Sequence, residues 1–162
     1  MFTYIKNSEL NSEGTVYFGP QGFTLFSSQA EQEKNHNKFT TDKSWNENWL
    51  VVGIDTELGD PYLVTYKNSE NNKLTDPSVY TAIFDDNGWS LVRVAKTIEA
   101  FVDCLNLINQ LTKQTTEIYV PDNSTITDKA LLKITEQKLI DISECDVFWQ
   151  QFFTCYIDWL EN

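Results

Sequence analysis

The residues best placed for chemistry form an acidic loop near the middle of the chain. Asp55, Glu57 and Asp60 fall within six residues there, and His36 is the only imidazole in the sequence. Carboxylate oxygens are the ligands that Ca²⁺ and Mg²⁺ prefer. The spacing of the three acids matches no metal-binding loop with a known mechanism, however, and Gly59-Asp60-Pro61 is characteristic of a turn. We therefore expect a turn at this point and no bound metal.

A second acidic segment, Asp85-Asp86-Asn87-Gly88, superficially resembles the start of a calcium loop. It lacks the distal glutamate that such a loop requires. Asn-Gly is the preferred pair of a tight hairpin turn, so a turn is again the favoured interpretation. With one histidine and three scattered cysteines, zinc is not expected, and no other cofactor is indicated.

Nucleophilic catalysis has little support in the sequence. Cys104 and Cys155 lie at or beside the apolar faces of predicted helices, where a free cysteine behaves as a small buried hydrophobe. No G-x-S-x-G, P-loop or G-x-G-x-x-G pattern occurs. A carboxylate pair for glycoside hydrolysis stays open, because separation in space decides it, although 24 acidic residues produce such pairs by chance. We expect no enzymatic activity.

Charge is the most unusual property of the composition. The sequence has 12 Lys plus Arg against 24 Asp plus Glu, a formal net charge of -12. Such a surface repels nucleic acid and anionic membranes, but attracts a basic protein partner and raises the rate of association. A solubility function explains the same charge, so both interpretations stay open. The sequence shows no signal peptide and no apolar run near the roughly 18 residues of a membrane span, so we expect a cytoplasmic protein.

The elements that position these residues follow from the hydrophobic pattern of a chain whose 162 residues suffice for one domain with a sizeable core. Strands are predicted at 15–18, 23–26, 49–54, 62–66, 79–84 and 89–95, with a further edge strand at 117–120. Helices are predicted at 28–37, 97–113, from Thr127 through Leu139, and at 144–160. The residues alone indicate an α+β domain with an acidic face.

Aromatic residues raise two further expectations. Three tryptophans flank predicted strands: Trp45, Trp49 and Trp89. They could anchor a partner protein, or each could close one edge of the core while its indole N–H finds one hydrogen bond. The core interpretation is favoured. The last predicted helix carries a heavy stripe that must be buried: Phe148, Phe152, Cys155, Tyr156 and Trp159.

The order of several short motifs resembles the SUKH superfamily, which contains yeast cell-wall-assembly regulators and bacterial toxin-immunity proteins. The motifs are Trp45 and Trp49, Val-Val-Gly53-Ile-Asp55, Gly59-Asp60-Pro61-Tyr62, Pro77-Ser-Val79-Tyr80, Gly88-Trp89 and Phe101-Val-Asp-Cys-Leu105. The resemblance covers about residues 15–111 of a single domain, 1–162, and leaves residues 115–162 as a helical extension. The sequence does not predict, before Thr15, the initial helix that is usual in the family, and we expect the helix at 144–160 to cover the sheet surface that this helix would have covered.

The resemblance implies a mainly antiparallel twisted sheet of about five to six strands with helices packed against it. It also implies a non-catalytic protein-binding module, an immunity protein that neutralises a cognate toxin by direct binding. A regulator or scaffold in cell-wall assembly is the alternative. The expected partner is a protein toxin or other protein with a basic surface. The acidic face that would meet it comprises Asp55, Glu57, Asp60, Asp85 and Asp86, with Trp45 as a further contact.

Overall fold

The computed structural model describes residues 14–66, 74–115 and 125–162. Six strands form one sheet in the order of the chain: β1 (Thr15–Phe18), β2 (Gln21–Leu25), β3 (Trp49–Asp55), β4 (Pro61–Tyr66), β5 (Leu74–Asp85) and β6 (Gly88–Ala95). Every neighbouring pair is antiparallel. The described helices are α2 (Gln29–Phe39), α3 (Ile98–Thr115), α4 (Lys129–Ser143) and α5 (Val147–Glu161). The expected α+β fold with an antiparallel sheet and packed helices is confirmed. The predicted edge strand at 117–120 lies outside the described residues.

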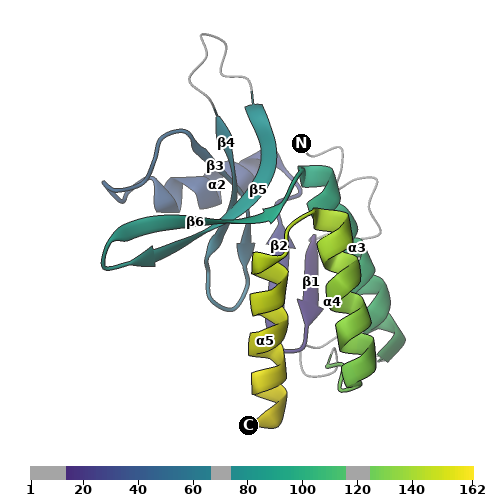
Figure 1. Ribbon diagram of the computed structural model, residues 1–162. Helices are drawn as coiled ribbons and strands as arrows, with labels where there is room; N and C mark the ends of the chain where they lie inside the picture. Colours follow the sequence, from purple (N-terminus) through teal and green to yellow (C-terminus); the bar gives the residue numbers. More distant parts are fainter. Residues whose placement is uncertain (1–13, 67–73, 116–124) are drawn as a thin grey trace.

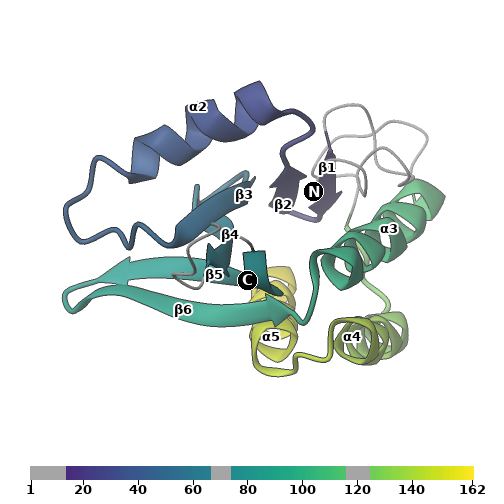
Figure 2. The same ribbon diagram turned by 90° about the horizontal axis from the view of Figure 1, so that it is seen from above.

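Helices cover both faces of the sheet (Figures 1 and 2). α2 lies along one face, and α3, α4 and α5 lie on the other. Alternate residues of each strand therefore enter two different apolar clusters, as the pleat of a strand requires. In β3, for example, Val52 belongs to the cluster beneath α3 and α5, whereas Val51 faces α2.

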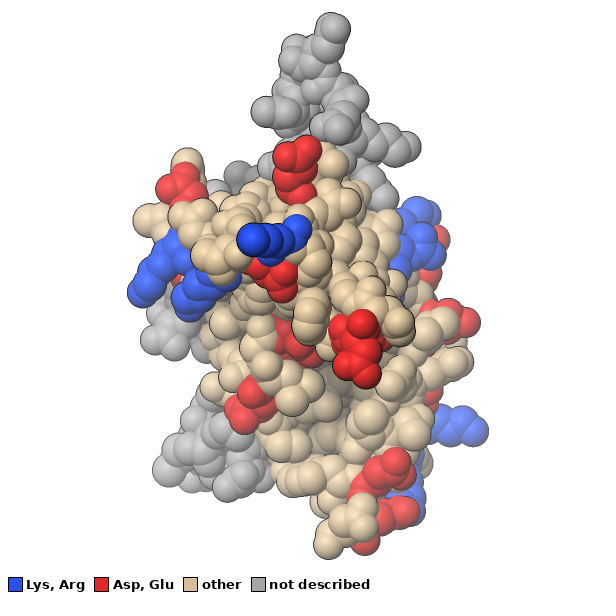
Figure 3. Space-filling model, turned by 90° about the vertical axis from the view of Figure 1, so that its left-hand side faces the viewer, with Lys and Arg blue, Asp and Glu red and all other residues tan. Residues whose placement is uncertain are grey.

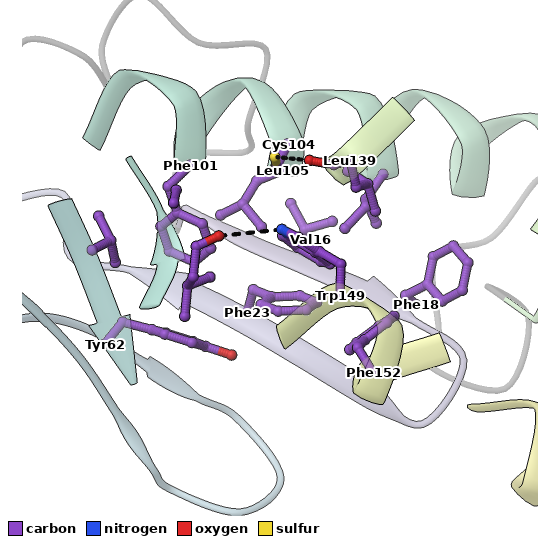
Figure 4. Packing of buried hydrophobic residues seen from close by; sticks show 14 of the residues in the cluster. Val16, Phe18, Phe23, Tyr62, Phe101, Cys104, Leu105, Leu139, Trp149 and Phe152 are labelled. Carbon is purple, nitrogen blue, oxygen red and sulfur yellow. Dashed lines mark hydrogen bonds between the residues drawn. The ribbon is translucent and has the colours of Figure 1, made fainter. Parts of the chain in front are cut away.

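The larger cluster, here called the main core, unites the first strands with the last helix (Figure 4). The ring of Phe18 lies 4.7 Å from that of Tyr156, and Phe23 lies 6.0 Å from Trp149, both measured between ring centroids. Tyr156 also exchanges two hydrogen bonds with the backbone of Ile126: its hydroxyl accepts from the amide at 2.7 Å and donates to the carbonyl at 3.1 Å. The extension is thus packed on the same sheet as the rest of the chain.

The buried stripe of α5 differs from the prediction. Trp149, Phe152, Phe153 and Tyr156 are buried, whereas Trp159 is 44% exposed and Cys155 is also exposed. Ten of the fifteen positions of this helix are apolar or aromatic, so the sequence fits more than one helical face. The i, i+3, i+4, i+7 set beginning at Trp149 is the one that the sheet covers.

Glycine 53 has the structural function that its place in an apolar strand predicts. The pairing of β3 with β4 changes register between Val51 and Gly53, which marks a bulge. A Cβ atom added at Gly53 would lie 2.4 Å from the carbonyl oxygen of Thr24 in β2. The backbone of β2 therefore approaches β3 more closely than any other residue type would allow.

Turn and cap residues produce three smaller corrections. The β1–β2 loop has two residues rather than four, because Phe18 pairs directly with Gln21 and Gly19 adopts the positive φ of 58° that tight hairpins use. The S-x-x-E spacing of Ser28 and Glu31 predicts a reciprocal capping box. Ser28 does cap α2, but the carboxylate of Glu31 accepts from the amide of Ser27 rather than from that of Ser28. Asp128, not Thr127, caps α4 by accepting from two backbone amides.

Two polar side chains fix α2 to the sheet. Gln32 is buried and donates to the carbonyl oxygen of Val51 at 3.0 Å, and the amide of the same valine donates to Nδ1 of His36 at 3.4 Å. Although α2 has no apolar stripe, Gln32 and His36 attach it to β3 by hydrogen-bonding both the carbonyl and the amide of Val51.

Candidate functional site

A pocket lies on the main-core face, where the β3–β4 loop, β5 and α5 meet, and encloses about 150 Å³. Its polar lining comes from Gln21, Asp55, Asp60, Tyr62 and Thr81. Its apolar lining comes mainly from Leu58, Ile83, Val92, Phe148 and Phe152. The sequence singles out the acidic loop but gives no sign that α5, about 90 residues further along the chain, supplies the facing wall.

Asp55 builds the loop. Its Oδ1 accepts hydrogen bonds from the amides of Glu57 and Leu58, both at 2.8 Å. Its amide donates to the carbonyl oxygen of Asp60 at 2.8 Å, and its carbonyl accepts from the amide of Gly59 at 2.9 Å. Asp55 therefore hydrogen-bonds turn amides, as an Asp in a turn is expected to do, and Gly59 supplies the positive φ of 78° that closes the turn.

Asp60 stands in the same turn, so its carboxylate is also expected to hydrogen-bond turn amides, but its environment is different. Within the described ranges its carboxylate takes no hydrogen bond from a turn amide, although it is half-buried beside the pocket. Burial raises the pKa of this carboxyl group above its ordinary value, and the nearby charge of Asp55 raises it further. Glu57 is exposed on the same loop and does not line the pocket.

Tyr62 also belongs to the candidate site. The sequence pattern places this residue in a strand and gives no sign that it lines a pocket. Only 2% of the residue is exposed, and its ring stacks on that of Phe23 with the ring centroids 5.9 Å apart. Figure 4 places its hydroxyl at the margin of the aromatic cluster. That hydroxyl has no hydrogen-bond partner among the described residues. Burial raises the pKa of Tyr62 well above its ordinary value, with further increases from Asp55 and Asp60.

The α5 wall carries Cys155, whose predicted burial is wrong. Its thiol is exposed at the pocket, one position before the buried Tyr156. The predicted burial of Cys104 is confirmed: it is fully buried, and its pKa is raised by burial and then by the charge of Asp103. Cys155 is exposed because the buried face of α5 is centred on Trp149, Phe152, Phe153 and Tyr156, and Cys155 lies outside this set.

Asp85 and Asp86 lie apart from the pocket in the β5–β6 turn. Oδ1 of Asp85 accepts from the amide of Asn87 at 2.7 Å, and Gly88 has a positive φ of 99°, so the predicted turn is confirmed. Both acids are exposed. Figure 1 shows this turn and the β3–β4 loop extending in different directions, and Figure 3 shows acidic groups separated by uncharged surface. The structure does not gather the five predicted acids into one patch.

Trp45 lies on the opposite face of the sheet from the pocket. It is 9% exposed and packs edge-to-face against both Trp49 and Trp89, with centroids 5.1 and 5.2 Å apart. The core interpretation of these tryptophans is therefore the better one. The expected hydrogen bond is missing for two of them, because the indole N–H groups of Trp45 and Trp89 are buried without an acceptor in the described part of the chain.

Within the described residues, no three His, Cys, Asp or Glu side chains come close enough to hold a metal ion. None of the described helices is both long and apolar enough to cross a membrane. The pocket can instead accept a cationic group, because its charged side chains are both carboxylates. Comparison with known proteins finds no matching family model, no similar curated protein and no similar solved structure.

Proposed function

We propose that the chain is a SUKH-type, non-catalytic binding module that neutralises a cognate protein toxin by direct contact. The observation that carries the proposal is the pocket with Asp55 and Asp60 inside it and exposed apolar side chains at its edge. Protein interfaces combine an apolar centre with specific polar contacts in this way. The motifs that resemble the superfamily support the same proposal.

The apolar edge of the pocket supports binding to a protein. Leu58 is 74% exposed and Ile83 is 44% exposed, and both line the pocket. Phe84, next to Ile83, is 56% exposed. Large apolar side chains that remain in water beside a concave acidic site lower their free energy when a partner covers them.

The net charge supports a basic partner. A chain at -12 attracts a cationic protein over a distance of about one Debye length, roughly 8–10 Å at physiological salt. This attraction raises the association rate more than the final affinity. In the described part of the chain the ion pairs are Lys96 with Glu144 and Lys129 with Glu161, and neither includes Asp55 or Asp60.

The test is co-expression with the product of any adjacent gene that kills cells when it is expressed alone. Wild-type protein should restore growth to cells that make the toxin. The double variant Leu58→Asp, Ile83→Asp should lose protection while remaining folded, because both side chains are exposed. Val147→Asp is the matched control, since Val147 is 62% exposed but does not line the pocket.

Cells that die equally with and without the wild-type protein would contradict the proposal. Unchanged toxin sensitivity together with an altered cell envelope on deletion of the gene would favour the alternative, a regulator or scaffold in cell-wall assembly.

A further inference from the structure

The pocket has more hydrogen-bond acceptors than donors. Asp60 and the second oxygen of Asp55 can only accept while they are ionised. Oε1 of Gln21 is buried without a donor, and the hydroxyl of Tyr62 has no partner among the described residues. A buried polar group without a partner, such as Oε1 of Gln21, is destabilising. An occupant that donates several hydrogen bonds and carries positive charge would satisfy these groups together.

We propose that this pocket receives the guanidinium group of an arginine side chain from the partner protein. The inference rests on the proposed function, because it names the group through which that partner is bound. Its geometric basis is the convergence of Asp55 and Asp60 from the β3–β4 loop with Tyr62, a residue only 2% exposed that lines the same pocket.

The apolar walls distinguish a side chain from a free ion. Phe148 and Phe152 of α5 face the loop carboxylates across the pocket, and Ile83 and Val92 complete the wall. The methylene groups of an arginine can pack on such a surface while the charged head reaches the acceptors. The enclosed volume of about 150 Å³ is also smaller than the roughly 300–1,000 Å³ of typical small-molecule sites.

Arginine fits the arrangement better than lysine. Its planar group presents five N–H donors, which can reach several acceptors at once, and it stacks on aromatic rings. The ammonium group of lysine is a more strongly hydrated point charge and loses more on entering an apolar pocket. An anionic occupant would face two carboxylates and is excluded by repulsion.

The direct test uses three tripeptide probes with blocked ends: Gly-Arg-Gly, Gly-Lys-Gly and Gly-citrulline-Gly. Citrulline keeps the shape of arginine but has no charge. Binding is followed by two-dimensional NMR of the full chain and by the rate at which Cys155 reacts with a thiol reagent. Cys155 is a native reporter, because it is exposed at the pocket whereas Cys104 and Cys145 are buried.

The arginine peptide should shift the amide resonances of Leu58, Tyr62 and Gln151 and slow the reaction of Cys155. It should bind at least threefold more tightly than the lysine peptide and at least tenfold more tightly than the citrulline peptide. Asp60→Asn and Tyr62→Phe should each weaken arginine binding at least fivefold. Asp86→Asn, which makes the same change of charge in the β5–β6 turn, should change it less than twofold.

Gln21→Leu is a second variant that alters the pocket without changing the net charge, and it should weaken binding at least twofold. Thermal unfolding curves show that each variant is folded. Equal binding of all three peptides, or an arginine effect that Asp60→Asn and Tyr62→Phe leave intact, overturns the inference. So does the absence of shifts at the pocket residues.

The inference and the proposed function can fail separately. In one case the wild-type protein neutralises the toxin, the arginine peptide does not bind in the pocket, and the Tyr62→Phe variant still protects cells. The arginine inference is then wrong and the proposed function stands. If the peptide occupies the pocket but no protection against the toxin is seen, the proposed function is wrong and the arginine site stands.

Discussion

The indole N–H of Trp149 donates to the carbonyl oxygen of Val94 at 3.2 Å and thereby joins the last helix to the last strand. Trp149 is fully buried, and its ring packs against Phe23 from the opposite end of the sheet. One side chain thus links three segments that lie far apart in the chain. The same helix forms the wall of the candidate pocket, so its docking determines both stability and the site.

Replacing Trp149 should therefore be strongly destabilising. Trp149→Ala should lower the free energy of unfolding by about 3–5 kcal/mol, the usual cost of removing a large buried aromatic side chain. Urea denaturation measures this change. Trp159→Ala in the same helix is the control, and it should cost less, because Trp159 is 44% exposed.

Deleting residues 143–162 should unfold or aggregate the protein, and unchanged thermal stability after the deletion would contradict the proposed covering function of α5.

Gly53 should tolerate no side chain. Gly53→Ala places a Cβ 2.4 Å from the backbone oxygen of Thr24, so β2 and β3 must separate. We expect a loss of about 1–3 kcal/mol, typical of overpacking, measured by chemical denaturation. Gly59→Ala is the comparison: its added Cβ meets no atom within 4 Å, so only the strain of a positive φ of 78° remains. Equal losses at both positions would show that close packing at Gly53 is unimportant.

Asp60 should make the protein less stable as the pH rises. Its folded pKa is raised by burial and by Asp55, so the folded state holds the proton more tightly than the unfolded state. The protonated form therefore contributes stability below the ordinary pKa of 3.8, and this contribution is lost as the pH rises through the folded pKa. The titratable groups that line the pocket with Asp60 are Asp55, Tyr62 and Cys155.

Asp60→Asn removes this dependence. The variant should melt at a higher temperature than the wild type at pH 7, and the two should converge below about pH 3.8. Asp86→Asn, an exposed carboxylate in the β5–β6 turn, is the control and should change the melting temperature less. A destabilising effect of Asp60→Asn at pH 7 would show that the carboxylate is better paired than the structure indicates.

His36 should act in the opposite direction. Burial lowers its pKa below the ordinary value of 6.5, and its Nδ1 accepts the amide of Val51, which a protonated ring cannot do. The stability that neutral His36 contributes is complete above pH 6.5 and is lost as the pH falls through the folded pKa. His36→Gln should flatten this part of the stability profile, and parallel profiles for the two proteins would contradict the assignment.

Local interactions explain why much of the fold was accessible from the sequence. Several turns and helix starts are fixed by atoms only a few residues apart in the chain. Asn87-Gly88 forms the β5–β6 turn, Ser28 accepts from the amide of Glu31 at the start of α2, and Thr97 accepts from the amide of Ala100 at the start of α3. Side chains of a strand alternate between its two faces, so the sequence places Val79 and Ala82 on opposite faces of β5, and they do lie in different clusters. Cap errors such as Thr127 for Asp128 arise because neighbouring residues of both types can accept a hydrogen bond from the first-turn amides, although Asp is the better cap of the two.

What the sequence determined by itself was the set of strands and helices, the acidic turn that Asp55 builds, and the net charge of -12. Only the tertiary structure decided which face of α5 is buried, because ten of its fifteen positions are apolar or aromatic and contact with Phe18 and Phe23 selects among them. It also separated Asp85 and Asp86 from the pocket and joined Asp60 and Tyr62 to Phe148 and Phe152. Such a grouping depends on helix docking across about 90 residues, and no local pattern encodes it.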